Sequence, residues 1–210
     1  KWASSEGVNI VADVSFKSGS PDISPQLLRI RQSGAQWVLG AYYIQDNILL
    51  IKTATSLGLN PYRALTYGGG FQVPTLLGLG ELAEGVVGIT TWNPDIKKPG
   101  VAEVARRFFE KYQVVMDHNA AKAYAGMWVL KDVLERARSA DKEKVRDAFH
   151  KTNITSGPAN ILTVDAIRFD EKGQLRQQGI AVQVQSGKFV SVWPAKLAGG
   201  ALNTSKLKAH

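Results

Sequence analysis

Short apolar runs alternate with helical segments over residues 8–91, and this alternation limits the fold more than any other feature of the chain. The apolar runs cover residues 8–14, 37–39, 63–67 and 86–90. Segments with helical periodicity lie between them. A strand–helix alternation of this kind predicts parallel strands joined by right-handed crossovers. The first run is β-branched and apolar, which predicts a buried strand.

Helix start and stop signals mark the connections between these runs. Ser24 stands where an N-cap is expected, and Pro25 follows at the first helical position. Asp46 is placed to cap the next helix, which Gly58 closes. Pro74 begins a third, short helix. The connections are therefore predicted to be helical crossovers.

The chain changes character after residue 95, where helices follow one another without a strand between them. Val101–Tyr112 and Ala120–Arg138 are predicted helices, and Asp141 caps a third helix that reaches about His150. The long helix carries an apolar stripe made of Ala123, Met127, Leu130, Leu134 and Ala137. A stripe of this width has to be covered. It packs either on the first sheet or on a sheet that this chain does not contain, and the sequence leaves both open.

The last part of the chain returns to β structure. Residues 161–164 and 166–169 are short apolar runs. Residues 179–184 and 188–193 predict a hairpin around Gln185-Ser186-Gly187. Residues 194–210 are rich in small residues and lysine, and we expect them to be a loosely held tail.

Composition excludes several classes of protein. The chain has 210 residues, of which 44% are hydrophobic and 21% charged, as in soluble globular proteins. It contains no cysteine, which excludes disulfides, thiolate metal sites and a cysteine nucleophile. No segment reaches the roughly 20 apolar residues that cross a bilayer, so we expect no direct membrane insertion. The net charge is +8, but the basic residues are scattered along the chain among acidic ones. This distribution favours a solvated surface over nucleic-acid binding.

Few residues offer catalytic or metal chemistry. The three histidines are His118, His150 and His210, which are far apart and without a metal-ligand spacing partner. We expect them to be surface residues, and we expect neither a metal nor a cofactor. An α/β enzyme would have to use Asp13, Ser15, Asp46 or the tyrosines, and only a converging base–nucleophile pair would favour that alternative.

A binding pocket is better supported, at the ends of the predicted strands. In an open parallel sheet the ligand crevice lies off the carboxyl ends of the strands. The candidate ligand-binding residues at these ends are Tyr42, Tyr43, Tyr67, Gly68, Gly69, Phe71 and Trp92. The glycines allow a ligand to approach the backbone closely, although they also suit a simple permissive turn. Each aromatic residue either lines a pocket or packs beneath its loop.

Several motifs resemble a known family when they are taken in order. They are Gly7–Val14 followed by Gly19-x-x-Asp22, Lys52-x-Ala54-x-x-Leu57-Gly58-Leu59, Phe169-Asp170-x-Lys172-Gly173-Gln174, and Val190-x-Val192-Trp193-Pro194. Their order and spacing over residues 7–194 resemble the second lobe of type I periplasmic binding proteins. The Leu/Ile/Val-type substrate-binding proteins of ABC importers are the most similar branch.

This resemblance implies an α/β fold: a three-layer αβα lobe with a parallel sheet, and helices that belong to a second, incomplete lobe. Residues 8–91 and 166–193 would form the second ligand-binding lobe. Residues 94–164 would be a helical segment returning to the first lobe, and residues 194–210 the tail. Most of the first lobe would precede residue 1.

The resemblance also implies a function. The chain would be the solute-binding component of an ABC importer in the periplasm or outside the cell, would close around a small ligand and would then meet a membrane permease. Tyr43 matches a tyrosine that contacts ligand in amino-acid-binding relatives. Those relatives carry an acidic residue after the next strand, which falls at or near Gly68 here, and the loop through Phe71 has no carboxylate. An aromatic or other organic acid therefore competes with an α-amino acid as ligand. A ligand-sensing domain of the same fold is the alternative to transport.

Overall fold

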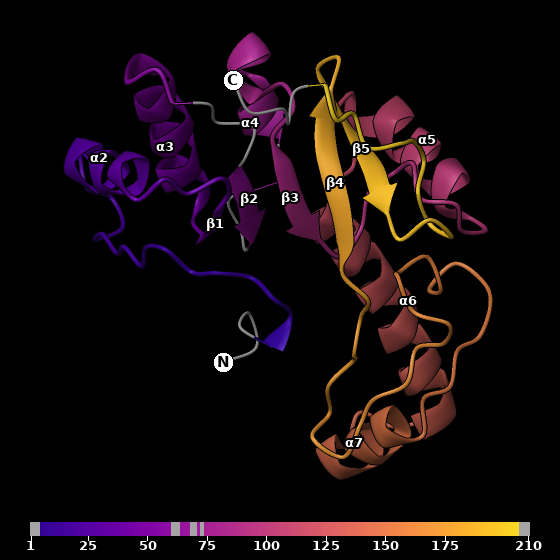
Figure 1. The fold of residues 1–210 in the computed structure, drawn as a ribbon. Helices are drawn as coiled ribbons and strands as arrows, with labels where there is room; N and C mark the ends of the chain where they lie inside the picture. The colour runs from indigo at the N-terminus through magenta and orange to yellow at the C-terminus, as the bar shows by residue number, and fades with distance from the viewer. Residues whose placement is uncertain (1–4, 60–63, 68–70, 72–73, 206–210) are drawn as a thin grey trace. The chain divides into compact units, whose positions relative to one another are not determined.

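The computed structural model describes residues 5–59, 64–67, 71 and 74–205. The chain divides into two compact units. The first comprises Lys1–Ile89, Val182–Phe189 and Leu202–His210, and the second Thr90–Ala181 and Val190–Ala201. The described strands form one five-stranded sheet in the order β1-β2-β3-β4-β5 (Figure 1).

The first unit contains the predicted strand–helix alternation. Its elements are α2 (Ser24–Gln32), β1 (Val38–Ala41), α3 (Ile44–Ser56), β2 (Ala64–Tyr67), α4 (Pro74–Leu77), the 3₁₀ helix η2 (Gly80–Ala83) and β3 (Val87–Thr90). β1 pairs in parallel with β2, where Val38 lies opposite Ala64. β2 pairs in parallel with β3, where Leu65 lies opposite Val87. The predicted parallel pairing is confirmed for these three strands.

Two predicted helix caps act differently from expectation. Helix α2 begins at Ser24, and the carboxylate of Asp22 accepts hydrogen bonds from the Ser24 N–H at 2.9 Å and from its hydroxyl at 2.6 Å. Helix α3 is preceded by Tyr43, whereas Asp46 is its third residue and bonds outside the helix. Gly58 does close α3, with φ at +69°. The helix positions were therefore predicted more accurately than their capping contacts.

The predicted first strand is wrong. Residues 8–14 lie outside the sheet without regular secondary structure, and Val8 and Ile10 are 54% and 63% exposed. A β-branched run forms a strand only where a neighbouring strand supplies hydrogen bonds and a face to pack on. The described sheet begins at β1, which pairs directly with β2, and the run takes no part in it.

The predicted hairpin is present as β4 (Ile180–Gln185) and β5 (Lys188–Trp193). Ser186 and Gly187 have φ of +51° and +69°, the conformation of a tight two-residue hairpin turn. Val184 exchanges hydrogen bonds with the chain just before β3, since its carbonyl accepts from the Gly85 N–H and its N–H donates to the Val86 carbonyl, each at 2.9 Å. β4 runs opposite to β3 (Figure 1).

The second unit contains the helices α5 (Val101–Tyr112), α6 (His118–Ala137) and α7 (Lys142–His150), as predicted. The carboxylate of Asp117 caps α6 at the Ala120 N–H (2.8 Å), and that of Asp141 caps α7 at the Lys144 N–H (3.1 Å). Helices α6 and α7 share an apolar cluster that is built on Val129, Val133, Ala148, Ala159 and Ile167. His118 corrects the surface prediction, because it begins α6 and is only 9% exposed.

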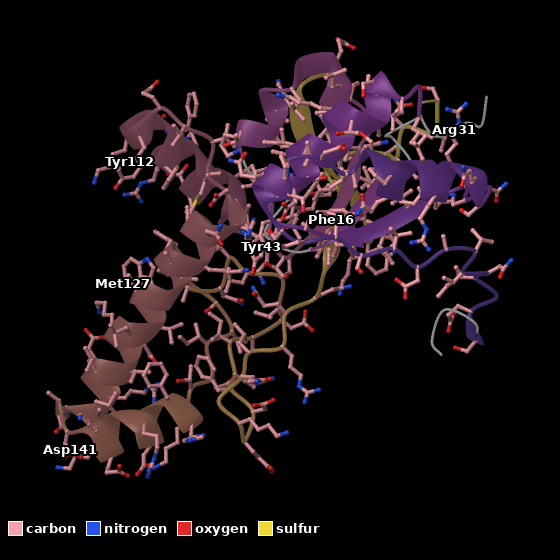
Figure 2. All side chains as sticks on the ribbon, turned by 90° about the vertical axis from the view of Figure 1, so that its left-hand side faces the viewer. Phe16, Arg31, Tyr43, Tyr112, Met127 and Asp141 are labelled. Atoms are coloured by element: carbon pink, nitrogen blue, oxygen red, sulfur yellow. The ribbon has the colours of Figure 1, made fainter. Side chains whose placement is uncertain are left out.

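Helix α6 buries a different face from the predicted one. Its buried apolar side chains are Ala121, Ala125, Val129 and Val133. Met127 and Leu134 of the predicted stripe are 65% and 41% exposed, and Met127 points away from the helix in Figure 2. The face of small and β-branched side chains is the one that enters the apolar cluster with α7.

Two shorter segments also differ from expectation. Residues 161–164 and 166–169 are not strands, and Ile167 makes only an isolated bridge with Ile154. The segment after β5 is held more firmly than a loose tail. Its Gly200 N–H donates to the Ser191 carbonyl at 3.1 Å, and the Asn203 N–H donates to the Gln183 side-chain oxygen at 2.8 Å.

Candidate functional site

A cavity of about 630 Å³ lies in the first unit at the carboxyl end of β1. It is lined by Val14, Ser15, Phe16, Ser18, Leu39, Gly40, Ala41, Tyr42, Tyr43 and Asp46. The strand end brings two of the predicted ligand-binding residues, Tyr42 and Tyr43, to its wall. The position follows from the parallel pairing, because ligands bind off the carboxyl ends of parallel strands.

The two tyrosines present different surfaces to this cavity. The ring of Tyr42 stacks on that of Phe16, with the ring centres 5.9 Å apart and the planes 23° apart. Burial raises the pKa of the Tyr42 phenol, so this group stays protonated at neutral pH. Tyr43 is 71% exposed and precedes α3. Figure 2 shows Phe16, from the segment before α2, and Tyr43, which stands just before α3.

Asp46 holds one wall of the cavity in place. Its carboxylate accepts a hydrogen bond from the Gly19 N–H at 2.9 Å and another from the Ser18 hydroxyl at 2.5 Å. These two bonds, with the Gly19 N–H first, lower the pKa of Asp46. The carboxylate is only slightly exposed and is occupied by the loop. It therefore joins the segment that carries Phe16 to helix α3.

Phe71 and Trp92, which we predicted at the same site, lie elsewhere in the structure. Phe71 is 1% exposed, packs edge-on against Phe189 at 5.3 Å between ring centres, and covers Gly88. Trp92 belongs to the second unit, is fully buried, and donates its indole N–H to the Ile161 carbonyl at 2.9 Å. Neither residue lines the cavity. A ligand-binding role for both stays a prediction.

The other predicted residues fall on the part of the chain that is not described. Gly68, Gly69 and the side chain of Tyr67 lie outside the described residues, while the backbone of Tyr67 ends β2 opposite Ala41. The sequence interpretation missed Leu39, Gly40 and Ser18 as lining residues. Gly40 could have been found from its position two residues before Tyr42, which was already a candidate. Residues two apart in a strand lie on the same face.

The cavity can bind a ligand through its shape and through apolar contacts. The lining residues that the structure describes include no lysine, arginine or histidine, and the Asp46 carboxylate among them is already hydrogen-bonded. Its hydroxyl groups are those of Ser15, Ser18 and the two tyrosines, and the Ser18 hydroxyl donates to Asp46. Among the described residues, no group of three or more histidine or acidic side chains is arranged to hold a metal ion.

A second and larger cavity, of about 940 Å³, lies in the second unit. Its wall carries five cations, Lys97, Lys98, Arg168, Arg176 and Lys196, against two carboxylates, Asp165 and Asp170. The Lys98 ammonium donates to the Val164 carbonyl at 2.5 Å and to the Asn160 side chain at 3.2 Å. Burial lowers the pKa of Lys98. This region was not predicted from the sequence.

The family model described as "Periplasmic binding protein" matches residues 1–188. The chain belongs to the periplasmic binding protein family. It is 25% identical over 195 residues to the Leu/Ile/Val-binding protein homolog 7 of Brucella suis, a match that covers 90% of this chain and 48% of that protein. It is also 25% identical over 204 residues to homolog 8 of Brucella melitensis, covering 93% of this chain and 50% of that one.

Solved structures of type I periplasmic binding proteins share the fold. The leucine binding protein LivK of Thermotoga maritima is 26% identical with a TM-score of 0.72, over 85% of this chain and 49% of that one. A solute binding protein of R. palustris in complex with benzoate is 14% identical with a TM-score of 0.74, over 94% and 53%.

The chain spans about half the length of the curated relatives it matches. In the described part of this family member, none of the helices is both long enough and apolar enough to cross a bilayer.

Proposed function

We propose that this periplasmic binding protein is the solute-binding component of an ABC importer. The observation that carries the proposal is the cavity at the carboxyl end of β1, where Tyr42 and Tyr43 stand in a chain of this family. The names of the Brucella relatives, which are Leu/Ile/Val-binding protein homologues, support the same function. The protein would act in the periplasm or outside the cell, without a cofactor and without catalysing a reaction.

The proposed ligand is a small amino-acid-like or organic acid, of the branched-chain amino acid or aromatic acid class. The leucine binding protein and the benzoate-bound solute binding protein among the similar structures illustrate the two classes. The cavity supports a ligand that turns an apolar part toward Tyr42 and Tyr43, because its described lining has no basic residue to pair with a carboxylate.

The proposed mechanism is closure of two lobes around the ligand. Residues 8–91 and 166–193 would form one lobe, and residues 94–164 would belong to the other. Residues 91–95 and 164–165 would act as hinges, since such motions concentrate in a few connecting residues. The ligand shifts the open–closed equilibrium only by its difference in affinity for the two states. The closed form would then be recognised by a membrane permease.

A titration of the full-length protein tests this function. Amino acids and aromatic acids are added one at a time while tryptophan fluorescence is followed, and we expect a saturable response to at least one of them. Tyr43→Ala should weaken binding about tenfold or more, as truncation of an anchoring aromatic side chain does. Tyr112→Ala is the matched control, because Tyr112 is a half-exposed tyrosine on α5 that does not line the cavity. No saturable response to any compound would refute the proposal.

A further inference from the structure

The ring of Tyr42 lies directly over Gly40 in the described structure. A Cβ atom placed on Gly40 would overlap the outer end of this ring, at the carbon that bears the hydroxyl and at the hydroxyl itself. Residues 40 and 42 point to the same side of the extended chain, which explains the contact. The φ of Gly40 is not in the left-handed region, so its backbone suits any residue. Glycine is needed at this position for space alone.

The ring over Gly40 is also part of the cavity wall. Tyr42 stacks on Phe16, and Gly40, Tyr42 and Phe16 all line the same cavity. A side chain at position 40 would therefore displace the Tyr42 ring from its stack on Phe16. The displaced atoms are the far end of a side chain that is only partly buried, so the rest of the unit can stay folded.

We propose that the stacked Phe16–Tyr42 pair binds a flat, uncharged ring of the ligand, and that Gly40 is a specificity-determining residue because it positions Tyr42. This inference rests on the proposed solute-binding function and narrows its ligand to acids that carry an aromatic ring. The pair offers a third ring the offset or edge-on contacts that aromatic groups prefer. An aliphatic group of the same size gains only the apolar contact.

The charges around the pair agree with this ligand class. Among the described residues no cation lines the cavity, and the carboxylate of Asp46 accepts hydrogen bonds from Gly19 and Ser18. The acid group of the ligand would find no partner among these residues. An unpaired buried charge is costly, so the acid group is not expected to enter. The ring end would enter this cavity, and the carboxylate would be bound outside it.

Two other glycines provide matched controls for position 40. A Cβ on Gly88 would overlap the ring of Phe71, which is fully buried, so Gly88→Ala tests a clash in the core. A Cβ on Gly126, in helix α6, would meet nothing within 4 Å. Gly126→Ala should therefore leave both folding and binding intact.

The test compares two probe ligands of equal charge, benzoate and cyclohexanecarboxylate, by calorimetric titration of the full-length protein. We expect benzoate to bind about three- to tenfold more tightly, which is the range of aromatic pair energies. Gly40→Ala should remove this preference while the unfolding midpoint stays near that of the wild type. Phenylalanine against leucine extends the comparison to amino acids, and Gly126→Ala should behave like the wild type.

Tyr42→Leu keeps the inference testable if Gly40→Ala does not fold, because it removes the ring without adding a side chain to the strand. It should also remove the preference for benzoate. Equal binding of the two ring acids by the wild type, or a preference that survives both variants, would overturn the inference and leave the proposed function standing. Failure of every amino acid and ring acid to bind would overturn both.

Discussion

Aromatic residues that follow predicted strands lie in two different surroundings in this protein. Tyr42 and Tyr43, after β1, stand at the wall of a cavity, and Tyr43 is largely exposed. Phe71 and Trp92, after β2 and β3, are fully buried among apolar side chains. The same local pattern therefore places rings at a cavity wall in one region and in the packed interior in another. What separates the two is the neighbour that each ring meets.

The two cavities differ in the charge of their linings. The larger one, in the second unit, has five cations in its wall, whereas the described wall of the smaller one at the strand end has none. Size alone would have favoured the larger cavity as the ligand site. The position of the smaller one at a parallel strand end, together with its aromatic wall, is the stronger argument.

Trp92→Ala should produce the largest loss of stability. Removing a fully buried indole leaves a cavity and deletes its hydrogen bond to the Ile161 carbonyl, and we expect a cost of about 3–5 kcal/mol. Urea unfolding measures this cost, with Tyr43→Ala as the exposed aromatic control. A Trp92→Ala protein that kept its stability and lost only ligand affinity would move Trp92 from the buried group to the cavity group.

Gly88→Ala should destabilise the protein by about 1–3 kcal/mol, because the new methyl group has to displace the buried ring of Phe71. Gly40→Ala should cost clearly less, since it moves the outer end of a partly exposed ring. Thermal unfolding of the two variants side by side measures the difference. Equal costs would contradict the distinction between a packed ring and a cavity ring.

Asp46→Asn should cost about 1–2 kcal/mol at neutral pH, through weaker hydrogen bonds to the Gly19 N–H and the Ser18 hydroxyl. The pKa of Asp46 is lowered in the folded protein, so its contribution is present above the ordinary carboxyl pKa of about 3.9 and is lost as the pH falls through the lower folded value. Urea unfolding of both proteins from pH 7 to pH 3 should show the gap closing only at the acid end. A gap that did not change with pH would rule out the charged carboxylate as its cause.

The smallest effect should come from His118 in the second unit. Burial first, and the Lys122 charge second, lower the pKa of His118, while Asp117 opposes them. The unfolded chain therefore binds the proton more readily, and stability should fall as the pH drops below about 6.5. His118→Gln should flatten the stability curve between pH 7.5 and pH 5.

Local signals predicted most of the regular structure. The helices α5, α6 and α7 and the hairpin of β4 and β5 lie where the sequence indicated, because side-chain caps and turn glycines act over a few residues. The family resemblance was confirmed by the match to the periplasmic binding protein model. Of the candidate site, Tyr42 and Tyr43 line the cavity.

The errors concern contacts between distant residues. The run at 8–14 has the composition of a strand but takes no part in the described sheet, and the Asp46 carboxylate accepts a hydrogen bond from the Gly19 N–H, 27 residues away. The apolar stripe through Met127 was identified as the buried face of α6, yet the face through Val129 and Val133 is the one that packs.

The sequence by itself determined where helices and turns begin and end and which family the chain resembles, because those properties depend on neighbours along the chain. Only the tertiary structure decided which face of α6 is buried, that Phe71 and Trp92 are packed while Tyr42 meets a cavity, and that Gly40 leaves space for the Tyr42 ring. The physical reason is that burial depends on surfaces brought together from distant parts of the chain. The residues next to an apolar side chain in the sequence do not show which distant side chain it will pack against.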